Sequence, residues 1–120
     1  MSIEVTDLWQ GVCINYRDLS TVENPTPRGI QYPMSPNSDC AGVITAIAPD
    51  VTGVDIGERV ISCFFQNWVD NGVTPDAMAS ALGGALPGVL AEQVLLSADG
   101  VIPCPDYLGD EEASLCPAPR

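Results

Sequence analysis

The sequence contains no histidine and no lysine. Its 120 residues carry four arginines as the only cations against sixteen aspartates and glutamates, a formal net charge of −12. Without histidine the chain has no Ser-His-Asp triad, no Cys-His pair and no imidazole ligand for a metal. Without lysine it has neither a P-loop lysine nor a residue for Schiff-base formation. These absences exclude several large classes of catalytic site.

The chain has too few positively charged residues to bind an anionic partner. Nucleic acids and anionic membrane surfaces are bound by basic patches, and four scattered arginines in so acidic a chain do not form one. The sequence also lacks an apolar run approaching the roughly 20 residues of a membrane span and an N-terminal secretory segment. We therefore expect no nucleic-acid partner, no membrane partner and a cytoplasmic location.

Cysteine occurs five times, an odd number, and no two cysteines form a C-x-x-C pair. This usage favours a reduced environment with buried thiols over a disulfide framework or a metal site. The five residues are Cys13, Cys40, Cys63, Cys104 and Cys116.

Glycine and proline are frequent, with eleven of each. This density favours short strands joined by many turns over a helical bundle. Short helices are predicted at residues 75–82 and 109–115. The proline-rich residues 20–39 are predicted to form a surface loop without a helix. Residues 1–11 show no clear pattern. Apolar runs predict strands at residues 41–48, 59–65, 88–96 and 101–102. The fold class is therefore mainly β, of the small barrel or sandwich type.

Five motifs resemble one family in their order and spacing. They are Asn15-Tyr16-Arg17-Asp18-Leu19, Ser38-Asp39-Cys40-Ala41-Gly42, Val54-Asp55-Ile56-Gly57-Glu58-Arg59-Val60, Gly83-Gly84 with Gly88-Val89-Leu90-Ala91-Glu92, and Pro103-Cys104-Pro105-Asp106. Together they resemble the N-terminal GroES-like domain of the medium-chain dehydrogenase/reductase superfamily, which holds zinc-type alcohol dehydrogenases and zinc-free quinone oxidoreductases. The resemblance implies a partly open GroES-like β-barrel with short helices over residues 12–116, lacking the family's opening hairpin. Residues 1–11 are then an unassigned N-terminal segment, and residues 117–120 are a C-terminal tail.

The resemblance points to the zinc-free branch. The family's zinc signature has Gly-His-Glu two residues before a glycine, which is Gly42 here, and those three positions hold Asn37, Ser38 and Asp39. Ser38 thus replaces the zinc-binding histidine, and Asn15 aligns with the catalytic zinc cysteine. Because Zn²⁺ selects nitrogen and thiolate sulfur ligands, a hydroxyl and an amide do not replace them. We therefore expect no metal.

The first motif contains the expected cofactor contacts. The resemblance implies that it faces a cleft toward a cofactor domain, where Asn15 bonds the nicotinamide side or a substrate oxygen, Tyr16 contacts the pyrophosphate and Arg17 pairs with phosphate. Each residue also has a structural interpretation. Asn15 caps a turn, Tyr16 belongs to the core, and Arg17 pairs with the carboxylate of Asp18 or Asp39.

The expected catalytic residues come from the first two motifs. Asp18 and Asp39 align with carboxylates that lie behind the family's reacting groups, and Asn15 and Ser38 align with groups at the reaction centre. The resemblance therefore implies a catalytic set of Asn15, Asp18, Ser38 and Asp39.

The family's reaction is hydride transfer with NAD(P)H, which requires a Rossmann domain. Its G-x-G-x-x-G fingerprint should follow a strand and open a helix, whereas the glycine cluster at residues 83–88 lies in a loop before a predicted strand. The resemblance therefore implies the substrate-side domain of a zinc-independent NAD(P)-dependent alcohol dehydrogenase or quinone oxidoreductase-like protein, inactive and unable to bind NAD(P) alone. Its substrate would be an alcohol, an aldehyde, or a quinone or enone.

The expected protein partners are a second copy of the chain or a protein that supplies the Rossmann domain. Two alternatives remain. One is a non-enzymatic β-barrel module that binds a partner through the exposed domain interface. The other is a truncated gene product without activity, in which unpaired strand edges would favour aggregation.

Overall fold

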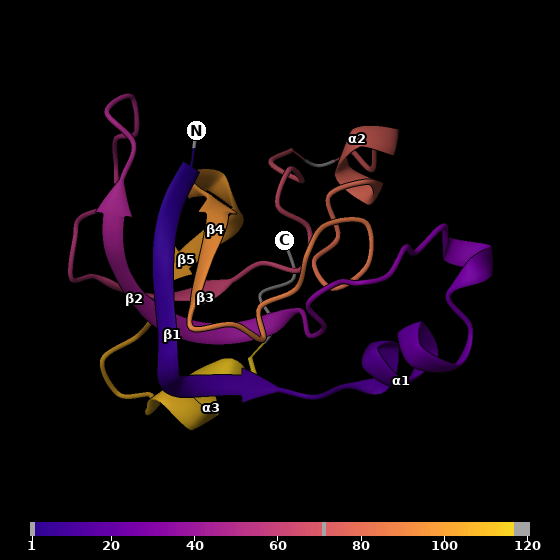
Figure 1. Cartoon of the computed structure of the whole chain (residues 1–120). Coiled ribbons are helices and arrows are strands. Elements are labelled where there is room, and N and C mark those ends of the chain that lie inside the picture. The colour runs from indigo at the N-terminus through magenta and orange to yellow at the C-terminus, as the bar shows by residue number, and fades with distance from the viewer. Residues whose placement is uncertain (1, 71, 117–120) are drawn as a thin grey trace.

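Five strands form one antiparallel sheet in the order β4-β1-β2-β3-β5, in a computed structural model that describes residues 2–70 and 72–116 (Figure 1). The strands are β1 (Ser2–Cys13), β2 (Asp39–Ile47), β3 (Arg59–Ser62), β4 (Gln93–Ser97) and β5 (Val101–Pro103). The helices are α1 (Tyr16–Glu23), α2 (Pro75–Met78) and α3 (Asp110–Ser114), with 3-10 turns η1 (Thr26–Arg28) and η2 (Ala98–Gly100). The mainly β fold class, a partly open barrel with short helices, is confirmed.

Strand β1 occupies the segment in which the sequence showed no pattern. It pairs with both β2 and β4 and so makes residues 2–11 part of the sheet. Its register with β2 shifts between Glu4 and Val5 and again between Thr6 and Gly11. Such irregularities interrupt the alternation by which a strand is recognised in a sequence.

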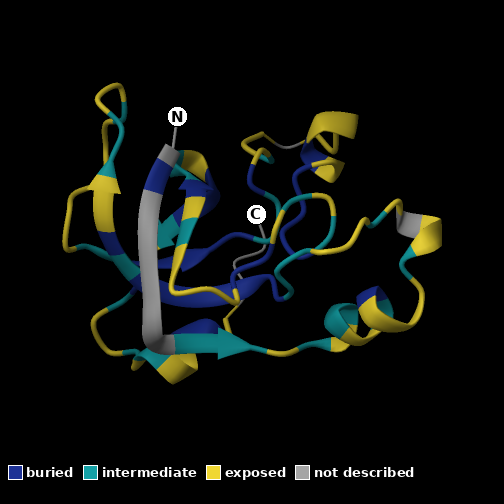
Figure 2. Cartoon of the chain, viewed as in Figure 1, coloured by how far each residue is buried: buried dark blue, intermediate teal, exposed yellow. Residues whose placement is uncertain are grey.

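Many of the buried residues belong to β2, to β3 and to the loops that connect the strands (Figure 2). One cluster of buried side chains links β1, β2, β3 and β4 with the loop at residues 82–89, and a second lies where α3 packs on the sheet. The first consists of Ile3, Cys40, Ile44, Val60, Leu82, Val89, Leu96 and Val101, and the second of Ala41, Ile61, Cys104 and Ala113. Both clusters include a residue from the beginning of β2, Cys40 in the first and Ala41 in the second.

The buried thiols expected from the sequence are found at Cys40, Cys63 and Cys104. Cys13 is only partly buried and Cys116 is exposed, so the expectation is wrong for these two residues. Cys116 lies just beyond the end of α3 at Ser114.

The predicted strand at 88–96 is shorter in the structure, because its first residues pair with a loop. The backbone N–H groups of Gly88, Val89 and Leu90 donate to the carbonyl oxygens of residues 35, 37 and 36, at 2.7, 2.9 and 3.1 Å. These bonds fasten residues 88–90 to the segment that leads into β2, and β4 begins only at Gln93.

The helix-free loop predicted at residues 20–39 is wrong at its start, because α1 runs through Glu23 before Pro25 ends it. The predicted helix at 75–82 is reduced to α2, a single turn capped by the Thr74 hydroxyl. None of the three α-helices in the described part of the chain is long and apolar enough to cross a membrane.

Candidate functional site

Asn15 is the N-cap of α1, at the point where β1 has ended. Its side chain accepts the backbone N–H groups of Arg17, at 2.8 Å, and of Asp18, and the Asp18 carboxylate accepts the Asn15 backbone N–H at 2.9 Å. This reciprocal capping box satisfies two N–H groups that a helix start leaves without partners. The capping role considered for Asn15 is confirmed.

The other end of the Asn15 side chain joins the start of β2. Its Nδ2 donates to the Ser38 Oγ at 3.2 Å and also to the Asp39 carboxylate. The Ser38 hydroxyl in turn donates to the same carboxylate oxygen at 3.1 Å. Three of the four predicted catalytic residues therefore form one hydrogen-bonded group, which we call the Asn15 cluster (Asn15, Ser38 and Asp39).

Asp18, the fourth predicted catalytic residue, ties α1 to the same segment. Its Oδ1 accepts the backbone N–H of Asn37 at 2.9 Å, while its other oxygen completes the capping box. Asp18 thus holds the helix start and the entry to β2 in one arrangement, and it acts on the Asn15 cluster by positioning it.

Asn37 is a residue of this site to which the sequence analysis gave no role. It has a left-handed backbone with φ of 70°, and its side-chain Nδ2 donates to the Cys13 carbonyl at 3.1 Å. Asn is the non-glycine residue that adopts this backbone most readily. The signal was in the sequence, because Asn37 stands where the family signature has glycine.

The cluster is buried on one side and accessible on the other. Ser38 and Asp39 are 2% and 5% exposed, whereas Asn15 is only partly buried. Burial raises the pKa of the Asp39 carboxyl, the hydrogen bonds from Asn15 and Ser38 lower it, and the nearby charge of Asp18 adds to the rise. The net upward shift of this pKa favours the protonated acid more than in water.

The side chains of Tyr16 and Arg17 are placed differently from each other. Tyr16 is 80% exposed, so its assignment to the core is wrong. The Arg17 guanidinium lies over the Phe64 ring at 4.7 Å, a cation–π contact that holds α1 against the loop after β3. Gly84 sits against this guanidinium, since a Cβ there would collide with it.

The donor set of the cluster does not suit zinc. It offers an amide, a hydroxyl and a carboxylate, whereas protein zinc sites are built from thiolates, imidazoles and carboxylates. In the described ranges, no three Cys, Asp or Glu side chains are grouped so that they could hold a metal ion.

An exposed apolar surface lies on α1 and on Ile14, the residue before the N-cap. We call it the α1 face; it consists of Ile14, Tyr16, Leu19 and Val22, each at least half exposed. Residues 16, 19 and 22 follow one another at the spacing of one helix face. Figure 1 shows α1 projecting from the sheet, so this face is open to an approaching partner.

The chain matches a family model described as the alcohol dehydrogenase GroES-like domain, over residues 8–106. It is 35% identical over 114 residues to a zinc-type alcohol dehydrogenase-like protein of Schizosaccharomyces pombe, a match that covers 95% of this chain and 33% of that protein.

Solved structures give the same result. A protein of Sinorhizobium meliloti classed as an alcohol dehydrogenase is 38% identical, with a TM-score of 0.82 over 97% of this chain and 34% of that one. At 20% identity, the quinone oxidoreductase of Coxiella burnetii shares the fold, with a TM-score of 0.68 over 94% of this chain and 31% of that one. This chain thus spans about a third of the length of these proteins.

Proposed function

Because this chain belongs to the family of alcohol dehydrogenase GroES-like domains, we propose that it is the substrate-side part of an NAD(P)-dependent oxidoreductase that works without zinc. Its substrate would be an alcohol, an aldehyde, or a quinone or enone. The observation that carries the proposal is the Asn15 cluster, in which an amide, a hydroxyl and a carboxylate bond one another.

Asn15 is the member of the cluster that can meet a ligand, since Ser38 and Asp39 lie behind it. Both hydrogens of its amide are directed inward, to Ser38 and Asp39, which fixes the orientation of the amide plane. Its Oδ1 accepts the Arg17 backbone N–H at 2.8 Å, and the capping box adds the backbone N–H of Asp18, so the amide is held from both ends. We infer that the partly exposed Asn15 amide, held in this orientation, lies against a substrate oxygen or the nicotinamide.

Ser38, Asp39 and Asp18 are positioning residues in this proposal. They hold the Asn15 amide through hydrogen bonds and do not reach the ligand. NAD(P)H would supply the hydride from a separate nucleotide-binding unit, because the described sheet is antiparallel throughout and offers no βαβ unit for a dinucleotide. Tyr16 and Arg17, at the start of α1, would contact the cofactor phosphates from this side.

The α1 face is the surface to which we assign that unit. Its four apolar side chains are exposed next to Asn15, and the relatives matched by this chain are about three times as long. A nucleotide-binding unit on this face would cover the apolar side chains and at the same time lie close to Asn15.

We place the protein in the cytoplasm, where its thiols would stay reduced.

A second candidate is a non-enzymatic module that binds a protein through the α1 face. The same exposed apolar residues favour it, because patches of this kind often mark interaction sites. In this case a protein partner would bind the chain without conferring NAD(P)H oxidation on the complex.

The zinc-free assignment is tested by zinc loading under reducing conditions. After incubation with Zn²⁺ and dialysis against a weak chelator, we expect the chain to retain no stoichiometric zinc by elemental analysis. The variant Asn15→Cys with Ser38→His supplies a thiolate and an imidazole beside Asp39, and it should retain one ion per chain. Replacing Cys13 and Cys116 by serine controls for the accessible thiols. One zinc per wild-type chain that is lost in Asp39→Asn would refute the assignment.

The cofactor assignment predicts that the chain alone does not bind NADPH. Calorimetric titration should give no binding heat at micromolar concentrations, since the pyrophosphate site of a dinucleotide lies on the Rossmann unit. Arg17→Ala is the matched control for any weak heat that arises from phosphate contacts. Micromolar binding that Arg17→Ala leaves unchanged would contradict the proposed division between two units.

A further inference from the structure

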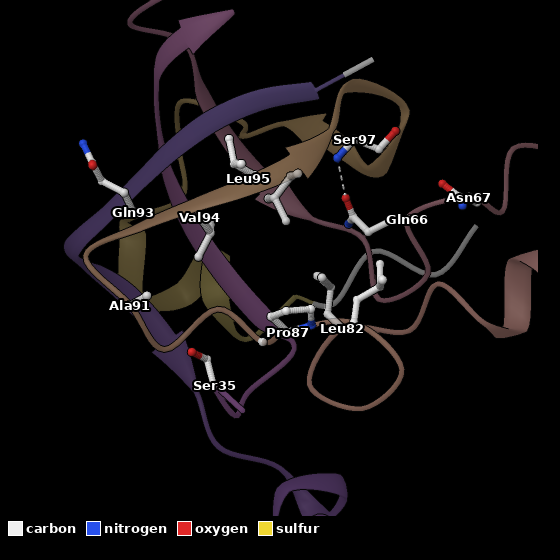
Figure 3. A pocket seen from close by; sticks show the side chains of 13 residues that line it. Ser35, Gln66, Asn67, Leu82, Pro87, Ala91, Gln93, Val94, Leu95 and Ser97 are labelled. Carbon is white, nitrogen blue, oxygen red and sulfur yellow. Dashed lines mark hydrogen bonds between the residues drawn. The ribbon is translucent and has the colours of Figure 1, made fainter. Parts of the chain in front are cut away.

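Strand β4 is an edge of the sheet. Within the described residues it pairs on one side only, with β1. The backbone N–H of Ser97 donates to the Gln66 side chain at 2.8 Å, so it points away from β1 (Figure 3). Because backbone groups alternate along a strand, the N–H and C=O of Gln93 and Leu95 point the same way, to the outer edge.

A hollow of about 540 Å³ follows this edge. All five residues of β4 line it, and its opposite wall comes from the loop at residues 82–91 (Figure 3). Its apolar lining includes Leu82, Leu86, Val94 and Leu96. Edge hydrogen-bonding groups and an adjacent apolar hollow are the two elements by which a sheet binds an added strand.

The charges around the β4 edge indicate which kind of peptide strand could pair with it. β4 itself, Gln93–Ser97, contains neither a charged residue nor a proline, the usual devices that block an edge. An exposed acid flanks each end, Glu92 before the strand and Asp99 after it. The edge is therefore neutral along its length and negative at both ends.

We propose that the β4 edge binds an extended peptide segment of a partner protein as an antiparallel sixth strand. The segment has apolar side chains at alternate positions, which enter the hollow, and a basic residue at each end, which meets Glu92 or Asp99. Its backbone pairs with Gln93 and Leu95, because the Gln66 side chain already occupies the N–H of Ser97.

A second copy of the chain does not fit this edge. Antiparallel pairing of β4 with itself, centred on Leu95, brings Glu92 of each chain next to Asp99 of the other. Like charges opposed across strands are destabilising, and each chain already has a net charge of −12. A peptide with basic ends would instead be attracted both by the acids beside β4 and by the negative net charge of the chain.

The probe is the synthetic peptide Arg-Thr-Val-Thr-Val-Thr-Arg with a fluorescent label, titrated with the whole chain and followed by anisotropy. We expect saturable binding that weakens with added salt and that protects the Leu95 amide from hydrogen exchange. Leu95→Pro removes the outward N–H without removing a β1 hydrogen bond, and should weaken binding about tenfold. Leu95→Ala keeps the N–H and should bind within about twofold of wild type.

Two N-methylated peptides test the geometry on the wild-type chain, whether or not Leu95→Pro folds. In an antiparallel pair, the threonine N–H groups face β4 and the valine N–H groups face away. N-methylation of the threonines should abolish binding, and N-methylation of the valines should not. Equal binding of both peptides, no binding of the unmodified peptide, or a Leu95 amide already protected by self-association in sedimentation would overturn the proposal.

Discussion

Replacing Gly88 by alanine is expected to lower the free energy of unfolding by about 3 kcal/mol, at the upper end of the cost of overpacking. A Cβ at this position would collide with the backbone oxygens of both Pro36 and Asn37. The backbone cannot yield freely, because Gly88 and Val89 donate hydrogen bonds to Ser35 and Asn37 at 2.7 and 2.9 Å. Moving residues 88–90 away from residues 35–37 would break those bonds and displace the segment that leads into β2.

Urea denaturation followed by tryptophan fluorescence measures this loss. Gly72→Ala is the matched control, since a Cβ there meets open space and the backbone is not left-handed; it should change stability by no more than about 0.5 kcal/mol. A Gly88→Ala chain as stable as Gly72→Ala would show that residues 88–90 are not fastened to residues 35–37 in solution.

The proximity of Asn15, Ser38 and Asp39 could be predicted, because it depends on residue types in motifs, whereas their role in catalysis stays a prediction. Asn15 is 23 positions from Ser38 and 24 positions from Asp39, and in the structure its side chain donates hydrogen bonds to both. The resemblance predicted their proximity. Composition and periodicity alone did not, since a contact over that separation is set by how β1 turns into α1 beside β2.

The helices and strands were less predictable where contacts distant in the sequence determine where they begin and end. Prolines at 25, 27, 33 and 36 correctly exclude a helix over most of residues 20–39, but the capping box of Asn15 and Asp18 begins α1 earlier. Residues 88–90 have the apolar pattern of a strand and pair with a loop instead. The bulges of β1 interrupt its alternation. In each case a long-range or capping contact overrides the local pattern.

Asn37→Ala is the second change with a large expected effect, about 2–3 kcal/mol of unfolding free energy. Alanine in the left-handed region costs roughly 1–2 kcal/mol. The lost bond from the Asn37 side chain to the Cys13 carbonyl adds about 1 kcal/mol. Asn37→Gly keeps the backbone region accessible and loses only the side-chain bond, so it should cost about 1 kcal/mol.

The order of the two variants separates backbone strain from hydrogen bonding. Denaturation midpoints should fall in the order wild type, Asn37→Gly, Asn37→Ala, with the exposed Asn24→Ala close to wild type. If the alanine variant were the more stable of the two at position 37, the left-handed backbone would not be a constraint in solution. The order we expect means that the left-handed backbone of Asn37 is a constraint in solution, directly before Ser38 and Asp39, the two residues to which the Asn15 amide donates.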